Sequence, residues 1–272
     1  MSGGPGVEGR IERAFARCRA AGRPALVTYV MGGDPDLAGS KAMALACVAG
    51  GADLLEIGVP FSDPIADGST IQQAAGRALA HGTSPRDCLE VVRAVRAASD
   101  VPVALMGYLN PLLAAGLDAF VAEAAAAGVD AFIVPDLLPE SSSELAVPAA
   151  RAGVRTVFLL APTSTPDRVA AAAAAATGFV YLVSVTGVTG ARAELPTDLA
   201  GKVAAIRAAS GVPVVIGFGV STPAQARALG AQADGVVVGS AIVSRVAAGG
   251  TRAVRAARVR RFVGTLARAL RR

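Results

Sequence analysis

Apolar positions along the chain fall into short, nearly continuous runs that alternate with alanine-rich stretches of helical spacing. Near-continuous apolar strands that alternate with helices predict a parallel sheet covered on its outer face. Eight such units in about 250 residues favour a single (β/α)8 barrel, the TIM-barrel fold, over an open doubly wound sheet. The expected strands are ALVTYVM (25–31), DLLEIG (53–58), VPVALMGY (101–108), DAFIVP (130–135), RTVFLLAP (155–162), FVYLVSV (179–185), VPVVIGFG (212–219) and DGVVVGS (234–240).

Helical segments are also expected outside these eight units. A stretch from about residue 7 to 21 places Ile11, Phe15 and Cys18 on one helical face ahead of the first strand. The interval between the second and third strands leaves room for an added helical segment in a βα loop. Because no linker-like change of composition divides the chain, we expect one domain over residues 1–272.

Composition narrows the class of protein. Aromatic residues make up only 4% of the chain and tryptophan is absent, so the core must be aliphatic. Mean hydropathy is +0.52, yet glycine, proline or charge interrupts every apolar run before the roughly 18 residues of a membrane span. The N-terminal residues lack the apolar segment of a secretory signal. With three scattered cysteines, these features predict a cytoplasmic protein without a membrane partner.

The net charge of +5 raises the question of nucleic-acid binding. Arginines accumulate near the C-terminus, but Val259, Phe262, Val263, Leu266 and Leu270 recur among them at helical spacing. The arginines therefore fit the solvated face of a terminal helix. No aromatic surface for base stacking accompanies them, so no nucleic-acid partner is expected.

Glu56 lies in the middle of the apolar run of the second strand. The alternation of a strand places Leu54, Glu56 and Gly58 on the face that points into the barrel. A buried carboxylate needs a partner or a raised pKa. Within the expected strands the only basic residue is Arg155, at the start of the fifth. Glu56 is therefore predicted to be a functional carboxylate that transfers protons near the catalytic end of the barrel.

The loop after this strand, VPFSDPIADG, adds Asp63 and Asp67. Active sites of such barrels lie at the C-terminal ends of the strands, so either aspartate could face the same substrate. Each could equally serve a local turn or helix cap. The spacing of Asp63 and Asp67 does not decide which of them faces the substrate.

Glycines at the ends of three later strands predict a phosphate site. GVTG (187–190), GFGVS (217–221) and VVGSAI (237–242) match the backbone-lined phosphate cup of this fold. GVTGARAELP also has the character of a mobile lid. Neither lysine, Lys41 or Lys202, falls at a strand end, and no metal-ligand cluster occurs. Acid–base chemistry by carboxylates on a phosphorylated substrate is the reaction class that remains, without a metal or a Schiff-base lysine.

The segment LEIGVPFSDPIADGSTIQ strongly resembles the alpha subunit of tryptophan synthase. The likeness continues through GDPD (33–36), MGYLNP (106–111), VPDL (134–137), YLVSVTGVTGAR (181–192), GFGVS and VVGSAIV. It implies carbon–carbon cleavage of indole-3-glycerol phosphate to indole and glyceraldehyde 3-phosphate. It also implies an α2β2 heterotetramer, in which a beta subunit carries pyridoxal phosphate and the alpha chain carries no cofactor.

The resemblance also implies roles for individual residues. Glu56 matches the general acid/base of the family, and Asp67 matches the carboxylate that interacts with the indole nitrogen. The positions that it associates with binding of the substrate are Tyr181 near the glycerol chain, Gly190, Gly219, Gly239 and Ser240 at the phosphate, and Phe218, Tyr108 and Ile65 at the indole pocket or the loop after the second strand.

Two alternative functions share some of these features. An isomerase or epimerase acting on a sugar phosphate would have the glycine-lined phosphate site but would not need the SDPIADG loop above a buried glutamate. A barrel that has lost its chemistry and acts only as a partner subunit would not need Glu56 and Asp67.

Overall fold

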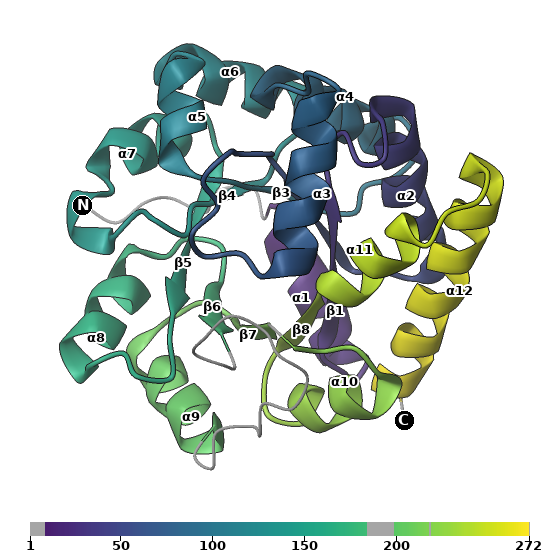
Figure 1. Cartoon of the computed structure of the whole chain (residues 1–272). Coiled ribbons are helices and arrows are strands. Elements are labelled where there is room, and N and C mark those ends of the chain that lie inside the picture. The colour runs from purple at the N-terminus through teal and green to yellow at the C-terminus, as the bar shows by residue number, and fades with distance from the viewer. Residues whose placement is uncertain (1–8, 184–198, 218, 272) are drawn as a thin grey trace.

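The computed structural model describes residues 9–183, 199–217 and 219–271. Eight parallel strands, hydrogen-bonded in the order of the sequence, close into a barrel (Figure 1). The strands are β1 (Ala25–Met31), β2 (Leu54–Gly58), β3 (Val103–Met106), β4 (Ala131–Ile133), β5 (Arg155–Leu160), β6 (Val180–Val183), β7 (Val214–Gly217) and β8 (Gly235–Val238). The predicted barrel and its eight strands are confirmed, although each strand except β1 is shorter than its apolar run.

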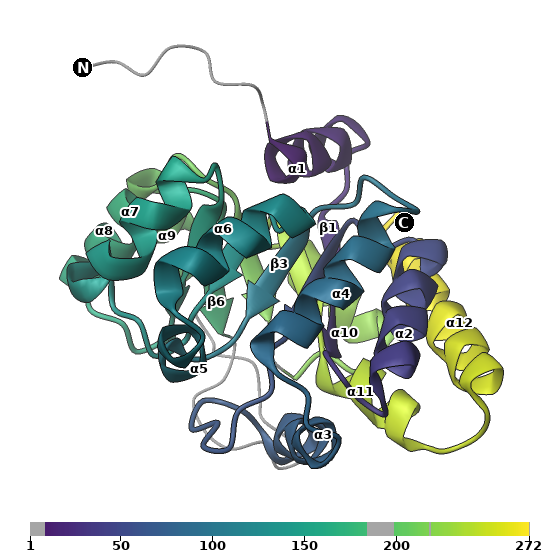
Figure 2. The same ribbon diagram turned by 90° about the horizontal axis from the view of Figure 1, so that it is seen from above.

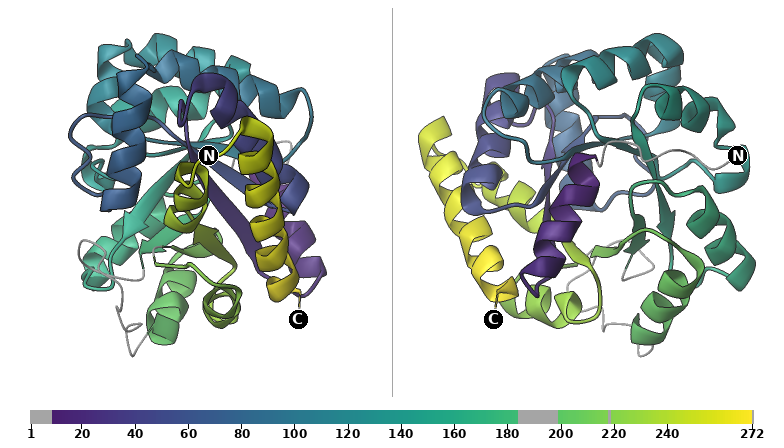
Figure 3. Two further views of the ribbon diagram at one scale, coloured as in Figure 1. Left: turned by 45° about the vertical axis from the view of Figure 1, so that its right-hand side comes forward. Right: turned by 180° about the vertical axis from the view of Figure 1, so that it is seen from behind.

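Helices surround the barrel, and α1 crosses one of its ends (Figures 1 and 3). The helix before the first strand and the added helical segments between β2 and β3 are both present as expected. The helices are α1 (Arg10–Ala20), α2 (Leu37–Gly50), α3 (Ser69–Ala80), α4 (Pro85–Arg96), α5 (Leu109–Ala114), α6 (Leu117–Ala127), the short 3-10 helix η1 (Pro139–Ser141), α7 (Ser143–Arg151), α8 (Pro166–Ala175), α9 (Leu199–Ala209), α10 (Pro223–Gly230), α11 (Ser240–Ala247) and α12 (Arg252–Leu270).

The alternation of side chains along the strands divides the core in two. In β2, Leu55 and Ile57 belong to the aliphatic cluster between the strands and the outer helices. Leu54 belongs to the second cluster, inside the barrel, together with Val27 of β1 and Val215 of β7. Glu56 shares its face of the strand with Leu54 and therefore points into the barrel, as its position in the sequence predicts.

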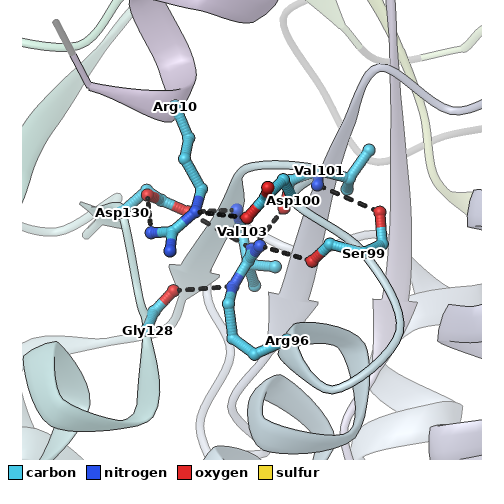
Figure 4. Close-up of polar contacts among 8 residues, drawn as sticks. All are labelled: Arg10, Arg96, Ser99, Asp100, Val101, Val103, Gly128 and Asp130. Atoms are coloured by element: carbon cyan, nitrogen blue, oxygen red, sulfur yellow. Dashed lines mark hydrogen bonds and ion pairs between the residues drawn. The ribbon is translucent and has the colours of Figure 1, made fainter.

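Helix α1 lies across the N-terminal end of the barrel, at the opposite end from α3 (Figure 2). A cluster of arginines and aspartates attaches its first turn to the loops below β3 and β4 (Figure 4). Arg10 Nη1 lies 3.2 Å from Asp130 Oδ1, and Asp130 Oδ2 also accepts the backbone N–H of Val103 at 2.8 Å. Arg155, the basic residue of β5, pairs with Glu12 of α1 over 2.7 Å. Its charge is thus engaged at the end of the barrel away from the predicted chemistry.

The C-terminal helix α12 packs against α2, α10 and α11 along the outside of the barrel. Its buried residues include Val259, Phe262, Val263, Leu266 and Leu270, so the apolar face predicted from the sequence is the face that packs. Within the parts of the chain that the structure describes, no helix is both long and apolar enough to cross a membrane.

Candidate active site

Glu56 is the most unusual ionisable group of the barrel interior. Its side chain is 1% exposed, and neither carboxylate oxygen has a hydrogen-bond partner among residues 9–183, 199–217 and 219–271. Burial alone raises the pKa of Glu56 to about 8. The carboxyl group is therefore protonated in most molecules at neutral pH, which makes it able to donate a proton.

Asp67 lies in the loop between β2 and α3, and Tyr108 fixes its orientation. The Tyr108 hydroxyl donates to Asp67 Oδ2 at 3.2 Å and accepts the backbone N–H of Ala66 at 2.9 Å. Burial raises the pKa of Asp67 to about 6, although the bond from Tyr108 opposes that shift. Asp63 is exposed and bonds with its neighbour Ser62. The structure thus distinguishes the two aspartates, and Asp67 is the one placed among partly buried polar groups.

Two tyrosines of the barrel wall, one on β1 and one on β6, enter the same region. Tyr29 of β1 pairs in register with Glu56 of β2, and Tyr181 of β6 pairs with Val215 of β7. Both phenols are buried, and burial, with the nearby carboxylates Glu56 and Asp67, raises the pKa of each well above its usual value. Two acidic and two phenolic groups therefore share one apolar interior.

Each of these tyrosines lies over a glycine of the neighbouring strand. A Cβ atom added at Gly58 would overlap the hydroxyl of Tyr29, and one added at Gly217 would overlap that of Tyr181. Any larger residue at either position would displace the phenol or bend the strand. Gly58 and Gly217 thus make the space that lets both hydroxyls reach the catalytic end of the barrel.

Backbone groups suited to a phosphate lie after β7 and β8. Gly219 has a φ of +77°, in the left-handed region that favours glycine. Gly239 is the N-cap residue of α11, and the exposed Ser240 is its first residue. The first turn of a helix leaves N–H groups without internal partners, which suits an anion. Gly190 and Phe218, together with the predicted lid at 187–196, lie outside the described residues.

The comparisons with known proteins agree on one family. A sequence model described as tryptophan synthase alpha chain matches residues 15–271. The tryptophan synthase alpha chain of Geobacter sulfurreducens is 51% identical over 234 residues, which cover 86% of this chain and 89% of that one. The alpha chain of Halorhodospira halophila is 49% identical over 263 residues, which cover 96% of each. The chain belongs to the tryptophan synthase alpha chain family.

Solved structures support the same conclusion for the fold. A chain of Mycobacterium tuberculosis tryptophan synthase superposes with a TM-score of 0.90 at 40% identity, over 98% of this alpha chain and 100% of that chain. The alpha subunit of Legionella pneumophila gives a TM-score of 0.85 at 32% identity, over 97% and 99% of the two chains. Membership of the alpha-chain family implies a beta subunit as partner.

One residue of this alpha-chain site, Tyr29, was not among the candidates that the sequence suggested. It lies in an apolar run and has the same inward parity as Ala25 and Val27. The alternation of side chains along β1 could have predicted that the Tyr29 side chain, with its hydroxyl group, points into the barrel. That Tyr29 belongs to this site becomes clear only from the register of β1 and β2, which places Tyr29 directly beside Glu56.

Ile65, which the resemblance linked to the indole pocket or to the loop after β2, lies at the tip of that loop. Its side chain is 85% exposed, so in this structure it is not part of the buried group around Glu56. Phe61 of the same loop instead packs on Tyr108, with ring centroids 5.3 Å apart. The loop of this alpha chain therefore turns an aromatic residue inward and an aliphatic residue outward.

Proposed function

We propose that Glu56 and Asp67 carry out, in this chain, the reaction of the alpha-chain family, which cleaves indole-3-glycerol phosphate to indole and glyceraldehyde 3-phosphate in tryptophan biosynthesis. The observation that carries the proposal is the state of Glu56. It is buried, it has no hydrogen-bond partner within the described part of the chain, and its pKa is about 8. Such a carboxyl group is poised for proton transfer close to neutral pH.

Cleavage of this carbon–carbon bond needs an acceptor for the bonding electrons. A proton added to C3 of the indole ring gives an indoleninium cation, which can accept them. A base removes the proton of the glycerol hydroxyl next to the breaking bond, so that an aldehyde forms as the bond breaks and neutral indole is released. Proton transfers of this kind suit Glu56, and an ionised Asp67 would stabilise the charge on the ring nitrogen.

The described lysines lie on helices outside the barrel strands, and each is engaged by another group. Lys41 of α2 pairs with Glu90 over 3.5 Å, and Lys202 of α9 donates to the carbonyl of Pro162. These positions support a reaction that proceeds by carboxylate acid–base chemistry, without a Schiff base. Among residues 9–183, 199–217 and 219–271, no three histidine, cysteine, aspartate or glutamate side chains gather as metal ligands would. We propose a mechanism that uses no metal.

Substrate contacts are proposed for three groups of residues. The phosphate would lie at the N-terminal end of α11, where Gly239 and Ser240 begin the helix, with Gly219 and Gly190 beside it. Tyr181 would face the glycerol chain, and its buried hydroxyl lies over Gly217 at the catalytic end. The indole ring would lie near Tyr108 and Phe218, with Ile65 at the edge of the loop.

The partner and setting proposed here follow from the family. The chain would act as a single domain over residues 1–272, in an α2β2 heterotetramer in the cytoplasm. Pyridoxal phosphate would reside in the beta subunit, and this chain would hold no cofactor of its own.

Indole formation tests the proposed function directly. The chain is incubated with indole-3-glycerol phosphate, alone and with a beta subunit, and indole is followed over time. We expect cleavage in both cases, and faster cleavage with the partner. No indole in either case would exclude the reaction, and turnover of a sugar phosphate in its place would favour an isomerase or epimerase.

Tyr108→Phe is expected to lower kcat about tenfold at neutral pH, because Asp67 loses a hydrogen bond to its charged form. That bond opposes the effect of burial on the pKa of Asp67. Without it the pKa rises further, and the carboxylate needed for the reaction is lost at a higher pH. The pH profile of kcat measures the change: its acid limb should move upward. An unchanged acid limb would show that Tyr108 does not control Asp67.

A further inference from the structure

Asp34 is the second buried carboxylate of the described residues, and unlike Glu56 it is fully paired. It lies in the loop between β1 and α2 and is 3% exposed. Arg77 of α3 binds it with two parallel bonds, Nε to Oδ1 at 2.7 Å and Nη2 to Oδ2 at 3.0 Å. Such bidentate pairs fix orientation as well as distance. The pair therefore ties α3 to the end of β1 in one defined geometry.

The Asp34 side of this pair is held firmly on the barrel. The backbone N–H of Gly32 donates to the carbonyl of Gly58, the last residue of β2, at 2.9 Å. A Cβ atom on Gly32 would lie 2.6 Å from Cys88 Sγ and 3.0 Å from the same carbonyl, so the loop packs closely against this strand end. Gly58 follows Glu56 by two residues. Asp34 is thus an anchor that is fixed relative to Glu56.

Arg77 lies on α3, and this helix follows the loop that contains Asp67. Helix α3 begins directly after this loop, with Gly68 as its N-cap residue. In its first turn, Gln72 Nε2 donates to the carbonyl of Asp67 at 2.9 Å. A shift of α3 along the end of the barrel would therefore move the backbone of Asp67 with it.

Alanines dominate the apolar face through which α3 packs. Its buried residues are Ile71, Ala74, Ala75 and Ala78, which lie against the inner cluster of the barrel. Figure 2 shows the helix across the end of the barrel opposite α1. Methyl groups make few interlocking contacts, so a surface of alanines resists sliding weakly. The ion pair with Asp34 supplies the directional contact that this surface lacks.

We propose that Arg77 and Asp34 are positioning residues for the cleavage reaction: their ion pair sets where α3 lies on the barrel and so places Asp67 relative to Glu56. Their role depends on the one proposed above for Asp67. Neither residue needs to touch the substrate, because the pair acts through the helix and the loop.

Arg77→Lys tests this role, because lysine keeps the positive charge but cannot form the two parallel bonds. We expect kcat for indole formation, measured with the beta subunit present, to fall about tenfold, since small misplacements of reacting groups are costly. The dissociation constant for glycerol 3-phosphate should stay within about twofold, since the phosphate positions are built on β7 and β8.

Arg23→Lys is the matched control. Arg23 also forms a bidentate, largely buried pair, with its Nη atoms 2.7 and 2.9 Å from the carboxylate oxygens of Asp53, but at the opposite end of the barrel. We expect it to lower the melting temperature about as much as Arg77→Lys and to leave kcat within about twofold. The difference in kcat between two equally destabilised variants separates positioning from general stability.

Three results would overturn the positioning role: an unchanged kcat in Arg77→Lys, an equal loss of kcat in Arg23→Lys, or an equal loss of affinity for glycerol 3-phosphate. Should Arg77→Lys fail to fold, Asp34→Asn is judged by the same criteria, because the amide fills the same space and still accepts one bond from Arg77. A wild-type chain that forms no indole would instead reject the proposed function. An active wild type with an unaffected Arg77→Lys would reject only the positioning role.

Discussion

Glu56→Gln is expected to reduce indole formation by roughly 100- to 1000-fold at neutral pH. Glutamine has nearly the same shape as the protonated glutamic acid that burial favours, so the barrel interior should be preserved. It can still donate a hydrogen bond, but it cannot give up a proton and take it back. The loss should appear in kcat, while the dissociation constant for glycerol 3-phosphate stays nearly constant.

The same chemical change at an exposed site provides the control for this substitution. Glu144 of α7 is exposed on the outside of the barrel, and Glu144→Gln should leave kcat within about twofold of the wild type. If Glu56→Gln retained activity comparable with that control, the proton transfers could not depend on Glu56.

The second large effect concerns stability and its dependence on pH. The pKa of Glu56 is about 8 in the folded chain against the ordinary value of 4.5. From pH 4.5 to 8 the folded state therefore holds a proton that the unfolded state has released. The free energy of unfolding must fall as pH rises through this range, because ionisation of a buried carboxyl favours the unfolded chain. The shift corresponds to on the order of 5 kcal/mol between the two limits.

Glu56→Gln removes this dependence, so the inactive variant should be the more stable protein at alkaline pH. Denaturant unfolding at pH 4, 7 and 9 should show that the unfolding free energies of the two proteins separate as the pH rises, with the variant more stable by on the order of 5 kcal/mol at pH 9. Asp67 titrates in both proteins and cancels in the comparison. Parallel curves would mean that Glu56 ionises in the folded state as freely as it does in water.

Local pattern was enough to predict the barrel and the position of Glu56. The alternation in β2 predicts an inward side chain, and the scarcity of basic residues in the strands predicts that it has no charged partner. Both depend on residues close together in sequence or on composition. The predicted strand lengths were less accurate. Buried apolar residues continue beyond the ends of the strands into the turns, as at Val134 after β4.

The choice between Asp63 and Asp67 could not be made from local pattern. It depends on Tyr108, which lies 41 residues beyond Asp67 and reaches it only because the ends of β2 and β3 are adjacent in the closed barrel. Two aspartates four residues apart in one loop have the same local signals. The ion pair proposed to place α3 could not be predicted from local pattern either, because it joins Asp34 and Arg77, which are 43 residues apart in the sequence.

The three tyrosines of the chain lie at the catalytic end of the barrel, and tryptophan is absent. Ultraviolet emission of the unlabelled protein therefore arises almost entirely around Glu56 and Asp67. A ligand that enters this region, or an indole ring that accepts excitation energy from a nearby phenol, should change that emission without an introduced dye. This alpha chain therefore carries its own optical reporter at the site proposed for carbon–carbon bond cleavage.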